Sequence, residues 1–270
     1  MLITKNRSEA NSPKTISSIL QNKKDLLTKT LAILSALLLW QIVSMVVDID
    51  LLLVSPIDVV KRLFTLVVED EFLKIVLFTL TRIALGFFLG LVSGVLLSLV
   101  AGRFKIVETM LWPYMITIKS VPVASFVVVA LIWFKASNLS ALISFLMVLP
   151  IVYTNLLDGI KAVDKKMLQM ADVFKMPFGR RMRFIWLPSV KPFLISACKI
   201  SLGLAWKSGV AAELIGYPKG SVGEALYYSK LYLDTVDLFA WTVVIVILSV
   251  TFEKLFVFLL KRALKGVETL

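Results

Sequence analysis

Three lysines lie inside apolar stretches of this 270-residue chain, where a charged side chain is costly. Lys119 shares its stretch with Pro122, and Lys199 and Lys207 lie together in a later one. A charge at the centre of a membrane helix costs about 2.5–3.5 kcal/mol on insertion scales, so such residues usually face a cavity or a partner. Backbone unwound near a proline is tolerated at membrane depth where it lines a cavity. These four residues therefore indicate a candidate translocation path that attracts an anion.

Other charged residues in the apolar stretches have a simpler interpretation. Arg82, Glu213 and Lys254 lie close enough to the ends of their stretches for the charged group to reach the membrane surface. Lys207 is also close enough in sequence to pair with Glu213 of its own or a facing helix. Under this interpretation the charges stabilise the helix bundle and carry no solute.

Several kinds of chemistry are excluded by composition. The chain has no histidine and one cysteine, Cys198, so histidine-assisted catalysis, histidine metal sites and disulfides are absent. The stretch 203–209 contains a Lys–Ser pair, but Trp206 occupies the place of the glycine that a phosphate-binding loop requires before its lysine. We therefore expect no catalytic residue, metal or cofactor in this chain.

The elements that position these residues are membrane helices. Hydrophobic residues make up 59% of the chain and the mean hydropathy is +0.89, whereas about 45–50% is usual for soluble domains. Because about 20 apolar residues cross a bilayer, we predict an all-α protein with six transmembrane helices. The predicted spans are 31–47, 75–101, 110–134, 139–157, 192–215 and 236–260.

Two of these spans allow another interpretation. The first resembles a signal peptide, but its polar leader is long and no small-residue cleavage site follows, which favours an uncleaved helix. The third is interrupted by Pro113, Lys119 and Pro122, so a re-entrant segment would leave five spans.

The distribution of basic residues predicts the orientation. Placing both termini in the cytoplasm puts 19 of the 30 lysines and arginines there and six outside, as the positive-inside rule requires. This charge pattern explains the net charge of +12 better than nucleic-acid binding does. We expect a cytoplasmic segment at 1–30, a transmembrane permease domain at 31–262 with a cytoplasmic loop at 158–191, and a tail at 263–270.

Two further patterns concern packing. Gly86, Gly90 and Gly94 repeat at every fourth position of the second span, which allows another helix to approach closely. Packing within one bundle is a better explanation than a dimer contact. The external stretch 57–68 has apolar residues at helical spacing, so we expect a helix along the outer membrane surface.

The loop 158–191 is the longest predicted cytoplasmic segment and has the features of a docking site. A helix at 168–174, a break at 176–179 and a second, basic helix are predicted from its sequence. Exposed apolar residues rimmed by charge mark a protein-binding surface. The apolar residues expected at this surface are Met170, Val173, Phe174, Met176 and Phe178.

This loop resembles the coupling motif of ABC importer permeases, in which Glu-Ala-Ala, three residues, Gly and nine residues precede Ile-x-Leu-Pro. Gln169, Met170 and Ala171 occupy the first positions and Lys175 replaces the glycine. Neutral Gln169 loses the charge of the family's glutamate, and the flexible turn is expected to move to Gly179. The residues that correspond to the motif and its surroundings are Gln169, Met170, Ala171, Asp172, Phe174, Lys175, Met176, Pro177, Phe178, Gly179, Ile185, Leu187 and Pro188.

Stretches across about residues 50–262 are similar to the nitrate, sulfonate and taurine branch of these permeases. The resemblance implies a homodimer in the bacterial cytoplasmic membrane, two copies of an ABC ATPase that uses ATP and Mg, and an extracytoplasmic solute-binding protein or lipoprotein. It also implies that the helix near Ala171 inserts into a groove of the ATPase. The solute remains open among oxyanions, sulfonates and small heterocyclic vitamin precursors.

Two other functions compete with the importer. An ion-coupled secondary transporter would use the charges in the spans, but such transporters usually contain internal repeats, and no repeat relates the first three spans to the last three. An intramembrane enzyme would need a histidine or a pair of carboxylates within the membrane.

Overall fold

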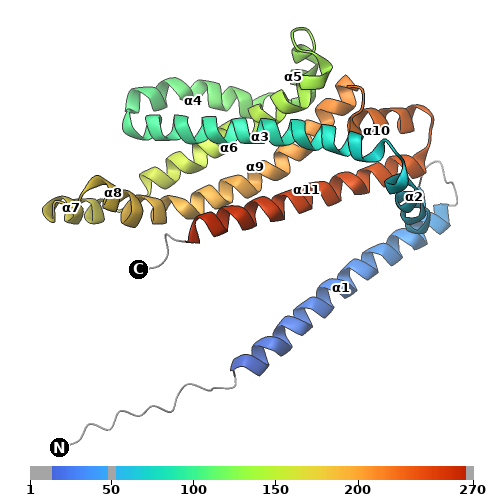
Figure 1. Ribbon diagram of the computed structural model, residues 1–270, viewed down its shortest axis with the longest axis horizontal. Helices are drawn as coiled ribbons and strands as arrows, with labels where there is room; N and C mark the ends of the chain where they lie inside the picture. Colours follow the sequence, from blue (N-terminus) through green and yellow to red (C-terminus); the bar gives the residue numbers. More distant parts are fainter. Residues whose placement is uncertain (1–13, 48–52, 266–270) are drawn as a thin grey trace, which may run out of the picture. The chain divides into compact units, whose positions relative to one another are not determined.

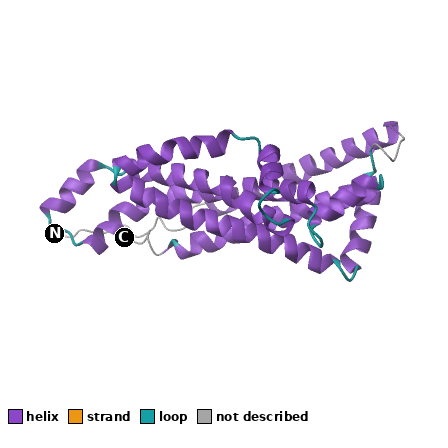
Figure 2. Cartoon of the chain, turned by 90° about the horizontal axis from the view of Figure 1, so that it is seen from above, coloured by secondary structure: helices purple, strands orange, loops and turns teal. Residues whose placement is uncertain are grey.

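The computed structural model describes residues 14–47 and 53–265 and divides them into two units, before and after the Lys61–Arg62 bond. Throughout the described residues the secondary structure is helical and no strand occurs (Figure 2). The start of the predicted cytoplasmic segment 1–30 and the end of the predicted tail 263–270 lie outside the described residues.

The first unit contains α1 (Lys14–Val47) and the first turns of α2 (Pro56–Val68). The indole nitrogen of Trp40 donates to the Val54 carbonyl at 3.1 Å, and the Ser44 hydroxyl donates to Leu53 at 3.0 Å. These bonds hold the chain after α1 against the end of that helix. The helix predicted at 57–68 is confirmed as α2.

The second unit is a bundle in which α3 (Phe72–Arg103), α6 (Ala136–Lys161), α9 (Leu187–Gly216) and α11 (Thr235–Ala263) run side by side (Figure 1). Helix α6 lies between α3 and α9, with α11 against α9. Phe87, Trp206 and Val148 belong to the core that these helices share. Cys198 is fully buried on α9.

The pairing of α3 with α6 depends on the three glycines of α3. A Cβ added at Gly86 would lie 2.2 Å from the Ala141 carbonyl oxygen, and one at Gly90 would lie 2.7 Å from the Cβ of Val148. A Cβ at Gly94 would meet Val152 at 2.8 Å. The glycines therefore allow close contact inside one chain.

Five helices are long and apolar enough to span a membrane: 30–47, 72–103, 136–161, 178–216 and 235–263. The third predicted span is broken into α4 (Lys105–Ser120) and α5 (Val123–Ala130), which meet at a 100° bend beside Pro122. If the bent pair crosses as one unit the described residues supply six spans, and otherwise five. The fold is therefore the all-helical, polytopic membrane fold that the sequence predicts.

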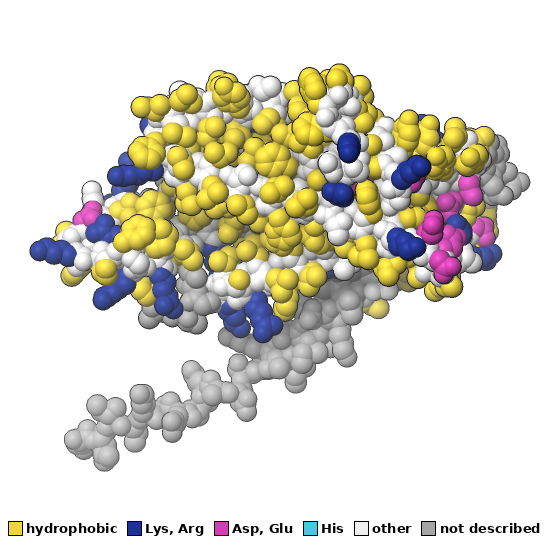
Figure 3. Space-filling view, turned by 45° about the horizontal axis from the view of Figure 1, so that its top comes forward, with side chains coloured by type: hydrophobic (Ala, Val, Ile, Leu, Met, Phe, Trp, Pro, Cys, Tyr) yellow, Lys and Arg dark blue, Asp and Glu magenta, His cyan; other side chains and the backbone are white. Residues whose placement is uncertain are grey.

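Charge separates the two ends of the bundle (Figure 3). We call one the basic end: it contains α7 (Lys165–Val173), α8 (Phe178–Arg181) and the end of α11. The opposite, acidic end contains α10 (Val222–Leu231), the start of α11 and the residues that follow α2. Acidic residues in or next to these elements of the second unit include Glu69, Asp70, Glu71, Glu224, Asp234 and Asp237.

Candidate functional site

The resembling motif folds into a small structure at the basic end, which we call the α7–α8 tip (residues 165–181). Asp164 caps α7 by accepting a hydrogen bond from the Lys166 amide at 2.8 Å. Ala171 is fully buried in a cluster with Val163 and Ile185. Alanine at 171 therefore serves packing within the tip, and its side chain is not available to a partner.

The turn after α7 does not move to Gly179, and that expectation is wrong. Lys175 itself has a left-handed backbone conformation, with φ +45°, while Gly179 lies inside α8. The Met176 amide donates to the Ala171 carbonyl at 2.9 Å, and the Lys175 amide donates to the main-chain carbonyl of Asp172 at 3.0 Å. This is the hydrogen-bond pattern of a Schellman helix end, whose left-handed position usually holds glycine. A lysine there costs about 1 kcal/mol more than glycine.

Apolar side chains project from the tip into solvent. Phe174 and Phe178 are 74% and 73% exposed, and Met170 and Val173 are also exposed. Met176 is different, because it is half-buried against the internal cluster, so its predicted place on the surface is wrong. Around the patch lie the exposed basic side chains of Lys165, Lys166, Lys175, Arg180 and Arg183.

The side chain of Gln169 is exposed and makes no hydrogen bond within the described part of the chain. The N-cap of α7 is Asp164 and not the first motif residue. Of the later motif residues, Ile185 is buried, Leu187 is half-buried and Pro188 is exposed at the start of α9. The structure thus places the motif within one compact segment and gives its members different environments.

The tip is joined directly to the bundle. Helix α8, a π-helical turn η1 (Met182–Trp186) and α9 form one continuous helix of 39 residues from Phe178 to Gly216. At 1.5 Å per residue it is about 58 Å long, enough to cross a bilayer and extend beyond it. The second helix of the tip and α9 are therefore parts of one helix.

One side of α9 is open. Lys199 and Lys207 are exposed, and a Cβ added at Gly203 between them would meet nothing within 4 Å. Lys119, at the end of α4, donates to the Thr154 hydroxyl of α6 at 3.2 Å. The two α9 lysines therefore share one face, whereas Lys119 is held on a different pair of helices.

Glu213 does not reach the surface or pair with Lys207 in this chain. It is fully buried, and its Oε2 accepts from the Thr79 hydroxyl at 2.7 Å and from the Gly223 amide at 3.4 Å. Thr79 Oγ1 accepts in turn from the Val222 amide at 3.0 Å. A carboxylate from α9 and a hydroxyl from α3 thereby fix the start of α10. No local pattern indicated this arrangement, because Thr79 is 134 residues from Glu213 in the chain.

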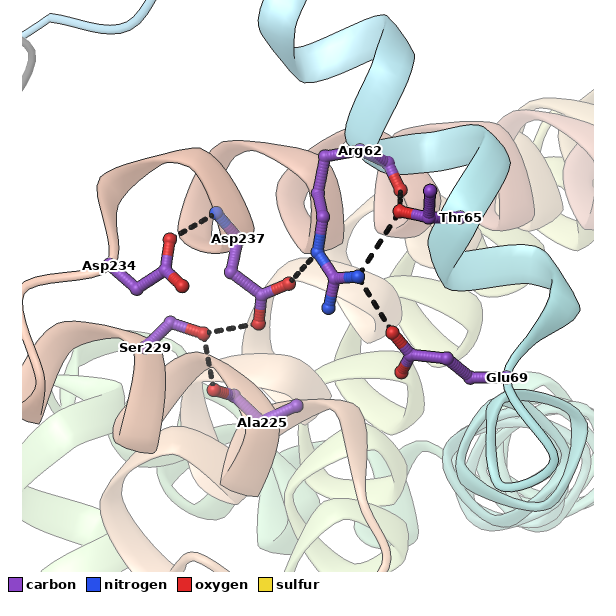
Figure 4. Close-up of polar contacts among 7 residues, drawn as sticks. All are labelled: Arg62, Thr65, Glu69, Ala225, Ser229, Asp234 and Asp237. Carbon is purple, nitrogen blue, oxygen red and sulfur yellow. Dashed lines mark hydrogen bonds and ion pairs between the residues drawn. The ribbon is translucent and has the colours of Figure 1, made fainter.

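A second network at the acidic end was also missed (Figure 4). The Arg62 guanidinium lies between Asp237, at 2.7 Å, and Glu69, at 2.6 Å. The Ser229 hydroxyl donates a hydrogen bond to the Asp237 carboxylate at 2.9 Å. Burial lowers the pKa of Arg62, but the hydrogen bonds that its guanidinium donates to Glu69 and Asp237 outweigh burial, and the pKa is raised. Arg62 therefore stays charged at all ordinary pH values and joins α2 to α11.

The described residues form a helical membrane bundle with exposed apolar side chains on the α7–α8 tip. Residues 86–266 match the family of the binding-protein-dependent transport system inner membrane component, and the chain belongs to this family. It is therefore a permease subunit of an ABC importer, a multi-pass protein of the bacterial inner membrane.

Relatives with assigned roles agree with this. The putative aliphatic sulfonates transport permease of Bacillus subtilis is 28% identical over 229 residues, 84% of this chain and 82% of that protein. The taurine transport system permease of Escherichia coli is 26% identical over 79% of this chain and 80% of its own length. The formylaminopyrimidine transport permease of Halalkalibacterium halodurans is 27% identical over 78% and 83%.

Family membership decides between the functions left open by the sequence. ABC importer permeases work with a separate ATPase and a substrate-binding protein, and they are not enzymes themselves. Ion-coupled secondary transport and intramembrane catalysis are therefore set aside.

Proposed function

We propose that the α7–α8 tip couples this permease to its ATPase and that the open face of α9 lines the path of a small anion in a homodimer. One observation carries the proposal. The continuous helix from Phe178 to Gly216 begins with the exposed Phe178, which follows the exposed apolar residues of α7, and it carries two exposed lysines further along. One continuous helix thus runs from the proposed ATPase contact to the proposed path.

The patch supports docking at the tip. Exposed aromatic side chains such as Phe174 and Phe178 bury large apolar areas when a partner covers them. The internal cluster of Val163, Ala171 and Ile185 holds the tip together without these two side chains. ATP binding in the ATPase would favour one position of the tip, and the transporter shifts between states to the extent that the ATPase binds them differently.

The open face of α9 supports a path shared by two chains. Lys199 and Lys207 lie two helical turns apart, and Gly203 between them leaves room for close approach. A second copy related by two-fold symmetry would present the same residues from the other side. The four lysines would make the path positive, which favours oxyanions and sulfonates over a neutral heterocycle.

Transport by reconstituted protein tests the solute class. The permease, its ATPase and its binding protein are placed in vesicles, and ATP-driven uptake of nitrate, taurine and a formylaminopyrimidine is compared. We expect uptake of an anionic or sulfonate probe, and we expect Lys199→Gln with Lys207→Gln to lower it about tenfold. Lys254→Gln, an exposed lysine of α11, is the matched control. Uptake of the pyrimidine alone, or wild-type uptake by the double variant, would overturn the anion path.

The proposed dimer is tested separately. Cys198 is the chain's one cysteine and is buried, so an introduced cysteine is the reactive one. Gly203→Cys should cross-link to a second copy with a short bismaleimide. Leu96→Cys, at an exposed position of α3, should not. Equal cross-linking of both variants would contradict the dimer face.

A further inference from the structure

The end of α7 has an unusual residue at its most constrained position. Lys175 adopts the left-handed conformation that closes a Schellman turn, a position at which glycine has no steric cost. The turn nevertheless forms, with the Met176 amide bonded to the Ala171 carbonyl. Other contacts of the turn therefore offset the steric cost of the left-handed backbone at Lys175.

Arg181, one helix further on, contacts this turn at three points. Its Nε donates to the Met176 carbonyl at 2.9 Å and its Nη2 donates to the Ala171 carbonyl at 3.2 Å. Its Nη1 forms an ion pair with Asp172 at 2.5 Å. A guanidinium is suited to this because its donors are fixed in one plane. One side chain thus binds both sides of the turn.

We infer that Arg181 is a positioning residue that holds the turn between α7 and α8 in the shape that the ATPase meets, in place of the glycine that is absent at 175. The inference rests on the proposed coupling role of the tip. Arg181 does not itself reach the exposed patch. It acts by fixing the direction in which Phe174 and Phe178, on opposite sides of the turn, project.

Neighbouring arginines allow this role to be separated from simple charge. Arg180 and Arg183 carry the same charge, and both are more exposed than Arg181. Arg183 lies over the ring of Phe184, 5.8 Å from its centroid. Within the described residues, neither the Arg180 nor the Arg183 side chain forms a hydrogen bond or ion pair with the turn. Arg180→Ala is therefore a matched control for Arg181→Ala.

The experiment measures the dissociation constant between the full-length permease and its ATPase in lipid nanodiscs, for wild type, Arg181→Ala, Arg180→Ala and Lys175→Gly. Arg181→Ala should raise the constant about tenfold, the scale expected for losing charge-assisted hydrogen bonds. Arg180→Ala should change it less than about twofold. Arg181→Lys, which keeps the charge but has one nitrogen, should fall between the two.

Rescue distinguishes positioning from general destabilisation. Because glycine removes the steric cost at 175, Lys175→Gly combined with Arg181→Ala should return the constant to within about threefold of wild type. Equal losses for Arg181→Ala and Arg180→Ala, or no rescue by glycine, would overturn the inference. Failure of the wild-type chain to bind the ATPase would instead overturn the proposed function of the tip.

Discussion

The two ends of the bundle use their side chains in opposite ways. At the basic end, large apolar residues such as Phe174 face solvent, and the polar contacts of the turn come from one arginine. At the acidic end, charged residues such as Arg62 and Glu213 bond to partners from distant helices. The acidic end is held together by its own side chains, whereas the basic end leaves large apolar side chains exposed. Variants at each end should therefore affect different measurements.

The largest effect is expected at a glycine of the acidic end. A Cβ at Gly223 would lie 2.2 Å from the Cβ of Glu213 and 2.4 Å from its backbone carbon, so Gly223→Val must displace α10. Overpacking of this kind costs about 3 kcal/mol, and we expect a clear drop in the midpoint of thermal unfolding in detergent. Gly179→Ala at the tip, with nothing within 4 Å, should leave the midpoint unchanged or raise it slightly. Equal midpoints for the two variants would show that the acidic end is not tightly packed.

The next effect is on binding, with stability unchanged. Phe174→Ala and Phe178→Ala should each raise the dissociation constant for the ATPase about 30-fold, corresponding to about 2 kcal/mol for an interface aromatic residue. Their thermal midpoints should match wild type, because both rings are exposed. Phe104→Ala, also exposed at the basic end but outside the tip, is the control. Loss of stability in the tip variants, or weaker binding by the control, would contradict the division between the ends.

A smaller effect is expected at the Arg62 network. Arg62→Ala leaves Asp237, whose side chain is only 17% exposed, without its cation. Hydrogen bonds to charged groups contribute about 1.5–3 kcal/mol, and the partial exposure places the expected loss near the lower value. The thermal midpoint should fall, while ATPase binding should not change. Lys61→Ala, which removes an exposed partner of Asp58, should have little effect on either measurement.

The smallest effect concerns pH. Hydrogen bonds from Lys61 and Ser55 lower the pKa of Asp58 at the start of α2. A carboxylate with a lowered folded-state pKa stabilises the protein above its unfolded pKa of about 3.9, and this contribution is lost as the pH falls through the folded value. The small difference in thermal midpoint between wild type and Asp58→Asn at pH 7 should therefore shrink as the pH falls below the unfolded pKa of about 3.9. A constant difference across that range would show that the ion pair does not contribute.

Local sequence patterns were sufficient to predict most of the architecture. Apolar runs located the spans, and Pro122 marked the place where the third one bends. The motif spacing located the tip, but the sequence could not show that Lys175 would take the left-handed conformation itself. That outcome depends on Arg181, which in the sequence is one of several basic residues in a cytoplasmic loop.

Glu213 shows the same limit at the acidic end. A carboxylate near the end of an apolar run is expected to reach the membrane surface. Its partner Thr79 is 134 residues away in the chain, and no local pattern connects the two. Contacts of this kind become visible only once α3, α9 and α10 are assembled.

The way in which Arg181 holds the turn also bears on how this protein can evolve. Two of its three contacts are to main-chain carbonyls, which every residue type provides. The exposed residues Met170, Val173, Phe174 and Phe178 take no part in the internal cluster of the tip. They are therefore free to change with a changing ATPase surface while the turn beneath them keeps its shape. If the tip contacts the ATPase as proposed, substitutions at these four positions alter that contact without disturbing the internal cluster.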